Sequence, residues 1–214
     1  MFSKKTAIFN HMKNHATIYT FMVILFLTGI IFGAVIVNSM NFVQKQDLFF
    51  YLEQFFGQVA HENFIDKQDI LKNSFLYHAR YLLFIFILGL SVIGLPIVWI
   101  LLFVKGLVIG FSVGFIVNQL GTNGFILASL SIAPQNLLII PVYIIAGSLS
   151  MIFSLTLINK LFSRRFSKPA SLQPLGAYLI IFVVLLCISF CAAALEAFVA
   201  NGAMELLIKS YYKK

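Results

Sequence analysis

A stretch of 54 residues, Gly106–Asn159, contains no Lys, Arg, Asp, Glu or His. In soluble domains about one residue in four is charged, so a stretch of this length would normally hold about a dozen charges. A helix needs only about 20 apolar residues to cross a bilayer, and this stretch is long enough for two crossings. The feature places the middle of the chain in lipid and excludes a soluble fold.

Composition extends this conclusion to the whole chain. Hydrophobic residues make up 61% and charged residues 10% of the 214 residues. Long uncharged runs predict an all-α fold, a polytopic integral membrane helical bundle with about five transmembrane helices in a single domain, 1–214. The predicted spans are Thr17–Val37, Tyr81–Val104, Gly106–Leu120, Leu137–Ile158 and Gly176–Val199.

The net charge of +8 does not indicate a nucleic-acid partner. The basic residues lie at the edges of the predicted spans, where they are typical of topology signals and lipid-headgroup contacts. Three of them precede the first span, and only Lys45 follows it within 15 residues. We therefore expect a cytoplasmic lead, 1–16, an extracytoplasmic loop, 38–80, and an extracytoplasmic C-terminus.

The loop Asn38–Arg80 begins with the pattern of an amphipathic helix. Apolar and aromatic side chains recur at helical spacing around Phe55, whereas Glu53 lies away from the centre of this stripe. Such a helix either lies flat in the headgroup region or packs on the protein's own spans. A second helix is expected to start after Asp66 or Asp69 and to continue into the second span.

Lys105 alone separates the second and third spans, which predicts a tight hairpin at Val104–Gly106. Pro96 should bend the second span. The third span has only 15 residues. It would measure about 22 Å, which is short for a hydrocarbon core of about 30 Å.

Glycine recurs at every fourth residue on one face of the first and third spans. Such faces allow helix backbones to approach closely and mark contacts between helices. The alternative is that the glycines are flexible or accidental, but three in register favour packing. We predict helix-packing or partner contacts at Gly29, Gly33, Gly106, Gly110 and Gly114.

A helix break is predicted at Pro134. As a single helix the run 125–158 would measure about 51 Å, which is longer than the bilayer core is thick. A re-entrant or interfacial half-helix at Phe125–Ala133 resolves this mismatch. The neighbouring Gln135 and Asn136 either satisfy backbone groups freed by the proline, or bind a partner helix or line a path.

Glu196 is the one carboxylate inside a predicted span. An intramembrane ionisable group is a functional-site hypothesis by default. Here it either faces another helix, or it is an interfacial carboxylate that is hydrated or paired with Arg80 or a lysine of the tail. No nucleophile–base pair, metal cluster or phosphate-binding glycine loop is present in the sequence. We therefore predict no catalytic residues, no metal and no cofactor, and do not expect an enzyme.

A transporter or channel for a small molecule or lipid is the main alternative, because broken helices such as those around Pro134 are typical of midplane binding sites. The uncharged stretch argues against it, since it offers no acid, base or counter-ion for coupling.

Several colinear strings complete the pattern: VNSMN (37–41), QKQDLFFYLE (44–53), FVKG (103–106), GFSVGF (110–115), PQNLL (134–138) and LEAF (195–198). They resemble the stage II sporulation protein M family of endospore-forming bacteria, over a range from about Tyr19 to Phe198. The resemblance implies a mother-cell membrane protein of forespore engulfment. It also implies a scaffold that anchors and localises two septal peptidoglycan hydrolases, stage II sporulation proteins D and P, and is not itself a hydrolase.

Distant relatives often place His and Gly after the proline and Glu before the next proline, where this chain has Gln135, Asn136 and Ile139. This departure favours assembly over transport. The expected partners are the two hydrolases and the lipid bilayer, in the septal or engulfing membrane, with a homo-oligomer left open.

Overall fold

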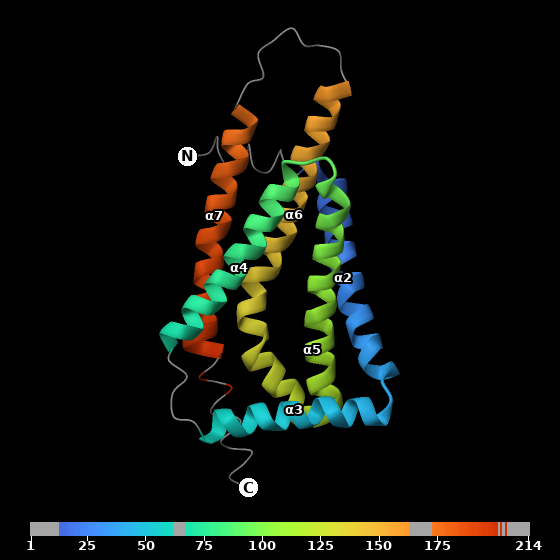
Figure 1. Cartoon of the computed structure of the whole chain (residues 1–214), viewed down its shortest axis with the longest axis vertical. Helices are drawn as coiled ribbons and strands as arrows, with labels where there is room; N and C mark the ends of the chain where they lie inside the picture. The colour runs from blue at the N-terminus through green and yellow to red at the C-terminus, as the bar shows by residue number, and fades with distance from the viewer. Residues whose placement is uncertain (1–12, 62–66, 163–172, 201, 203, 205–214) are drawn as a thin grey trace.

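The structure is a computed structural model that describes residues 13–61, 67–162, 173–200, 202 and 204. These residues are almost entirely helical and contain no strand (Figure 1), which confirms the all-α membrane bundle. The elements are α2 (Ala16–Ser39), α3 (Phe42–His61), α4 (Lys67–Gly89), α5 (Gly94–Ser131), α6 (Ala133–Phe162), α7 (Gln173–Leu195) and the π-helix η1 (Glu196–Ala200).

Five of the helices run along the length of the bundle, and α3 lies across one end (Figure 1). Within the described part of the chain, four segments are long and apolar enough to cross a membrane: Ala16–Ser39, Gly94–Ser131, Ala133–Asn159 and Leu175–Ala200. The fifth helix, α4, is more polar in its first half. It returns the chain from the α3 end to the end where α5 begins (Figure 1).

The predicted second span, Tyr81–Val104, is wrong because the chain turns inside it. The helix α4 ends at Gly89 and α5 begins at Gly94. A Cβ on Gly94 would collide with the backbone carbonyl of Leu88, and one on Gly89 would collide with the side chains of Ser150 and Tyr178. Gly94 therefore permits the turn itself, and Gly89 permits the end of α4 to pack closely against α6 and α7.

The predicted hairpin at Val104–Gly106 is wrong for the same reason, since Lys105 lies inside α5. Pro96 is the third residue of this helix. There it begins the helix instead of bending one, because backbone N–H groups of a first turn have no acceptor within the helix. From Gly94 to the residue before Gly121 the helix is about 40 Å long, so the short third span disappears.

The next reversal is at Gly121, with φ 57° and ψ −130°. After it, Gly124 lies against the backbone carbonyl of Ile116, eight residues earlier. In a continuous helix residues eight apart are separated by about 12 Å, so the chain must fold back here. The predicted half-helix, Phe125–Ala133, lies in the helical segment that follows, and its re-entrant placement stays a prediction.

The predicted break at Pro134 corresponds to a helix boundary two residues earlier, and this boundary is not a sharp break. The chain passes from α5 to α6 at Ile132 in helical geometry (φ −97°, ψ −37°). The N–H of Ile132 donates to the carbonyl of Ala128, and the N–H of Asn136 donates to the carbonyl of Ile132. Pro134 is the second residue of α6, where a missing N–H is tolerated. Pro141 does lie inside α6, which is visibly bent (Figure 1).

The core forms around α6, the most buried of the candidate spans. Serines of α6 also hold the end of α4: Ser150 Oγ donates to the carbonyl of Ile85 at 3.3 Å, and Ser154 Oγ donates to that of Ser91 at 3.1 Å. The buried apolar residues come from every crossing helix and include Met22, Phe26, Leu82, Ile85, Val98, Leu102, Ile139, Tyr143, Phe182 and Leu185.

Candidate functional site

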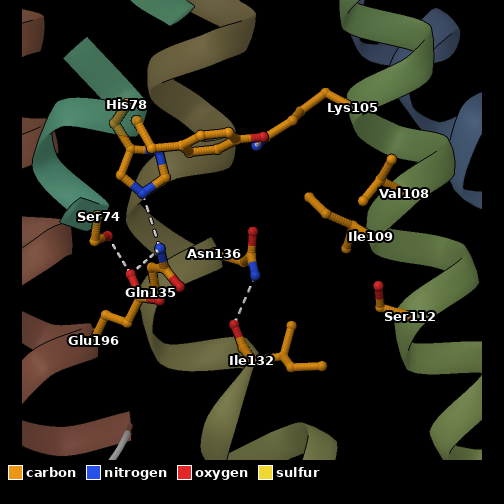
Figure 2. A pocket seen from close by; sticks show the side chains of 11 residues that line it. Ser74, His78, Lys105, Val108, Ile109, Ser112, Ile132, Gln135, Asn136 and Glu196 are labelled. Carbon is orange, nitrogen blue, oxygen red and sulfur yellow. Dashed lines mark hydrogen bonds between the residues drawn. The ribbon is translucent and has the colours of Figure 1, made fainter. Parts of the chain in front are cut away.

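A cavity of about 320 Å³ lies between α4, α5, α6 and η1 (Figure 2). Most of its lining residues are polar. Its polar lining residues are Ser74, Tyr77, His78, Lys105, Ser112, Gln135, Asn136 and Glu196.

Helical periodicity brings these side chains to one place. Ser74 and His78 are four residues apart on α4, and Lys105 and Ser112 are seven residues apart on α5, so each pair shares a helix face. Glu196 is the first residue of the π-helix η1, which continues directly from the last residue of α7.

A continuous chain of hydrogen bonds crosses the bundle beside the cavity. Glu196 Oε2 accepts from Ser74 Oγ and from Gln135 Nε2, the latter at 2.6 Å. The same Gln135 nitrogen lies 2.8 Å from His78 Nε2, and His78 Nδ1 lies 2.6 Å from the Tyr143 hydroxyl. Figure 2 shows Gln135 between His78 and Glu196.

The amide group of Gln135 determines the protonation in this chain. Its nitrogen has two hydrogens and no acceptor site, so it donates to both Glu196 and His78. His78 Nε2 is then an acceptor, and the ring proton lies on Nδ1 and points to Tyr143. This arrangement leaves the imidazole ring of His78 neutral.

Lys105 reaches from α5 toward α4 (Figure 2). Its ammonium group donates to the Tyr77 hydroxyl at 3.0 Å. It also lies 4.3 Å from the centre of the Tyr77 ring, 5.3 Å from that of Tyr81 and 5.2 Å from that of Tyr143. Contacts between a cation and ring faces at these distances partly compensate for the loss of hydration.

Lys105 and Glu196 line the same cavity without forming an ion pair. Their charged atoms are more than 4.0 Å apart, and among the described residues neither has another ion-pair partner. Charges inside a membrane protein are costly unless they are paired or face a wet cavity. The cavity between Lys105 and Glu196 therefore provides the polar surroundings that these two side chains need.

The structure brings together Gln135 and Asn136 of the predicted broken segment and Glu196 of the last predicted span. Glu196 faces α4 and α6 and is not paired with Arg80, which is exposed. Gln135 binds side chains of α4 and η1. Asn136 donates to the carbonyl of Ile132 at 2.8 Å, which already accepts from the Asn136 backbone N–H and is not the carbonyl that Pro134 frees. Pro134 does not line the cavity.

The predicted glycine contacts lie inside the chain, between α2 and α5. A Cβ on Gly29 or Gly33 would collide with the backbone of α5, and one on Gly106 or Gly110 would collide with the backbone of α2. Gly114 is looser, since a Cβ there would lie 3.4 Å from Ala34 Cα. These faces join two helices of one chain and leave no room for a partner helix.

The two predicted contact residues of the loop lie on α3, away from the cavity. Glu53 is exposed, and the side chain of Phe55 lies outside the described residues.

Sequence reasoning missed His78, Lys105 and Tyr143. His78 was counted with the polar loop, and Lys105 was interpreted as a hairpin residue. The available signal was the pair Gly89 and Gly94, which moves the turn and leaves Lys105 inside a helix. Among the described residues no group of three or more His, Cys, Asp or Glu could hold a metal ion.

The model of the family described as stage II sporulation protein M matches residues 22–201. No curated protein and no solved structure matches the chain. The matched range covers most of the chain and every element that lines the cavity. The chain therefore belongs to the stage II sporulation protein M family, a family of sporulation-related membrane proteins.

Proposed function

We propose that this chain is a multi-pass membrane anchor that assembles and localises septal peptidoglycan hydrolases during forespore engulfment. The family match supports a sporulation-related membrane protein, and the family is not known as an enzyme family. The proposed partners are stage II sporulation proteins D and P, which would supply the hydrolytic chemistry. The proposed location is the septal or engulfing membrane of the mother cell, with the N-terminus inside.

The observation that carries the proposal is the placement of α3 across one end of the bundle (Figure 1). Phe56 and Leu52 attach it to Leu127 and the residues around the Gly121 turn. Other large apolar side chains of α3 are exposed: Phe42 is 79% exposed, Phe50 62% and Tyr51 66%. Contiguous exposed apolar groups mark interaction surfaces, either with proteins or with the membrane.

The contacts of the glycine faces shift the proposed contact surface onto α3. Because the tight glycine contacts are made within the chain, they cannot also hold a hydrolase. In the proposed orientation α3 lies on the extracytoplasmic side, where peptidoglycan hydrolases act. Glu53 adds a charged group to the exposed surface.

Co-purification of the two hydrolases with the tagged full chain from native membranes tests this function. We expect the double variant Phe50→Ala, Tyr51→Ala to lower their recovery at least tenfold, since aromatic groups dominate the energy of many interfaces. Phe84→Ala is the control, because Phe84 is 52% exposed on α4, on the side of the bundle. Unchanged recovery with the α3 variant, at normal protein levels, would contradict the proposal.

Transport remains the second candidate, because the cavity supplies the ionisable groups that the uncharged stretch lacks. A transporter should show solute flux in liposomes that hold this chain alone, and Gln135→Leu should abolish it. If flux is absent with the intact chain while the hydrolases co-purify, the anchor function alone is retained.

A further inference from the structure

The charges of the cavity have hydrogen-bonding capacity that the protein does not use. The Lys105 ammonium group has three hydrogens, and among the described residues it donates one, to Tyr77. Both described hydrogen bonds to Glu196 fall on Oε2, so Oε1 is left without a donor from these residues. The Ser112 hydroxyl group offers a further donor on the α5 side of the cavity, whereas the Asn136 amide nitrogen points to Ile132 (Figure 2).

The unused hydrogen-bond donors and the unused acceptor lie on opposite sides of the cavity. One side of the cavity offers hydrogen-bond donors and a positive charge, and the other offers a carboxylate oxygen and a negative charge. A ligand that satisfies both needs an anionic group and, a few bonds away, an ammonium group with N–H donors. A purely anionic ligand would meet Glu196, and a purely cationic ligand would meet Lys105, so like charges disfavour both.

The side of the bundle gives access to this cavity. Tyr77 on α4 and Val108 on α5 both line it, and they are 55% and 50% exposed. The opening therefore lies between α4 and α5, on a lateral surface that a membrane would cover with lipid.

We propose that the cavity binds a zwitterion with a primary ammonium group, whose anionic group contacts Lys105 and Ser112 and whose ammonium group contacts Glu196. This chemistry has two sources in a cell membrane, the headgroup of phosphatidylethanolamine and a free amino acid. The ligand completes the pairing of two charges that the fold leaves apart.

Binding to the purified full chain in detergent tests the proposal. Thermal unfolding or native mass spectrometry is recorded with phosphatidylethanolamine, phosphatidylcholine, phosphatidylglycerol, or glycine added alone. Phosphatidylcholine keeps the phosphate but has no N–H donor, and phosphatidylglycerol has no ammonium group. We expect phosphatidylethanolamine or glycine to bind at least about tenfold more tightly than both comparison lipids, because truncating a buried charge pair costs at least that much.

The two arms identify the source of the ligand. Selective binding of phosphatidylethanolamine assigns a lipid headgroup, and saturable binding of glycine without it assigns a free amino acid. Equal binding of all three lipids, together with no effect of glycine, would overturn the proposal and leave a water-filled cavity. Phosphatidylglycerol as the tightest ligand would also overturn it, in favour of a simple anion site.

Variants of the two charged residues test the assignment of each contact. Glu196→Gln and Lys105→Gln should each weaken binding of the selected ligand at least about tenfold. Glu53→Gln, which removes an exposed carboxylate of α3, should leave it unchanged. If Glu196→Gln does not fold, Glu196→Asp keeps the charge but retracts it, and binding as tight as that of the native chain would refute the proposed ammonium contact.

Discussion

Replacing Gly110 by alanine tests the contact between α2 and α5, and Gly114→Ala is its matched control. Both glycines lie on one face of α5, a turn apart. A Cβ on Gly110 would overlap the backbone of Ile30, with the carbonyl carbon at 2.7 Å. A Cβ on Gly114 would lie at an ordinary contact distance, 3.4 Å from Ala34 Cα. Backbone atoms cannot move aside as a flexible side chain can, so only the first substitution forces the helices apart.

The expected difference follows from two terms. In a helix, alanine is favoured over glycine by about 0.8–1 kcal/mol, and this gain is common to both variants. Overpacking costs about 1–3 kcal/mol and applies to Gly110→Ala alone. Gly110→Ala should therefore be less stable than Gly114→Ala by about 1–3 kcal/mol, which is about 5- to 140-fold in the unfolding equilibrium constant.

Reversible unfolding of the purified chain in mixed micelles, titrated with dodecyl sulfate, measures this difference. Trp99 is the single tryptophan of the chain, and its ring packs edge-on against the ring of Phe21 on α2, with 5.3 Å between the ring centroids. Its fluorescence therefore reports the separation of α2 from α5. Equal unfolding midpoints for the two variants would refute the described contact.

Three further perturbations test the turns and the polar chain. The first uses single-cysteine variants in a chain whose native cysteines are replaced by serine. A membrane-impermeant maleimide should label Asn123→Cys from outside, Ser91→Cys only after permeabilisation, and Lys105→Cys in neither case. Labelling of Lys105→Cys to the extent of a loop residue would support the predicted hairpin at Val104–Gly106 instead. Gly121→Ala should destabilise the chain by about 1–3 kcal/mol, because φ is 57° and no neighbouring atom lies within 4 Å of the added Cβ, so the cost comes from the backbone alone. Gln135→Leu should lower the free energy of unfolding by about 1–3 kcal/mol, because it leaves His78 Nε2 without a donor and Glu196 with one donor fewer. Asn136→Leu should lower it less, since Asn136 bonds only a carbonyl of its own helix region. Equal unfolding midpoints for the two variants would contradict the hydrogen-bond chain.

Hydropathy predicts the elements of this fold wherever polarity changes along the chain. The helices α2, α3 and α7 fall close to their predicted ranges, and α4 begins near the acidic residues expected to start it. The turn between α4 and α5 could not be found in this way, because Leu90–Ile93 continues an apolar run without contrast. Lys105 is the first charged residue after this run, so hydropathy places the boundary between two spans there, although the turn lies between Gly89 and Gly94.

The candidate site was only partly predictable for a related physical reason. Gln135, Asn136 and Glu196 are conspicuous because polar groups are rare in apolar spans. His78 is not conspicuous in a polar segment, and its importance depends on contacts with residues 57 and 65 positions away. Such contacts follow from the packing of α4 against α6, which periodicity alone does not specify.

The measurement that tests the proposed function most directly is site-specific photo-crosslinking in sporulating cells. A photoreactive phenylalanine analogue is placed at position 51, where Tyr51 is 66% exposed on α3, and at position 84 on the side of the bundle as a control. The membrane-anchor function predicts crosslinks from position 51 to stage II sporulation protein D or P, identified by mass spectrometry, and none from position 84. Crosslinks to lipid alone at both positions would contradict it.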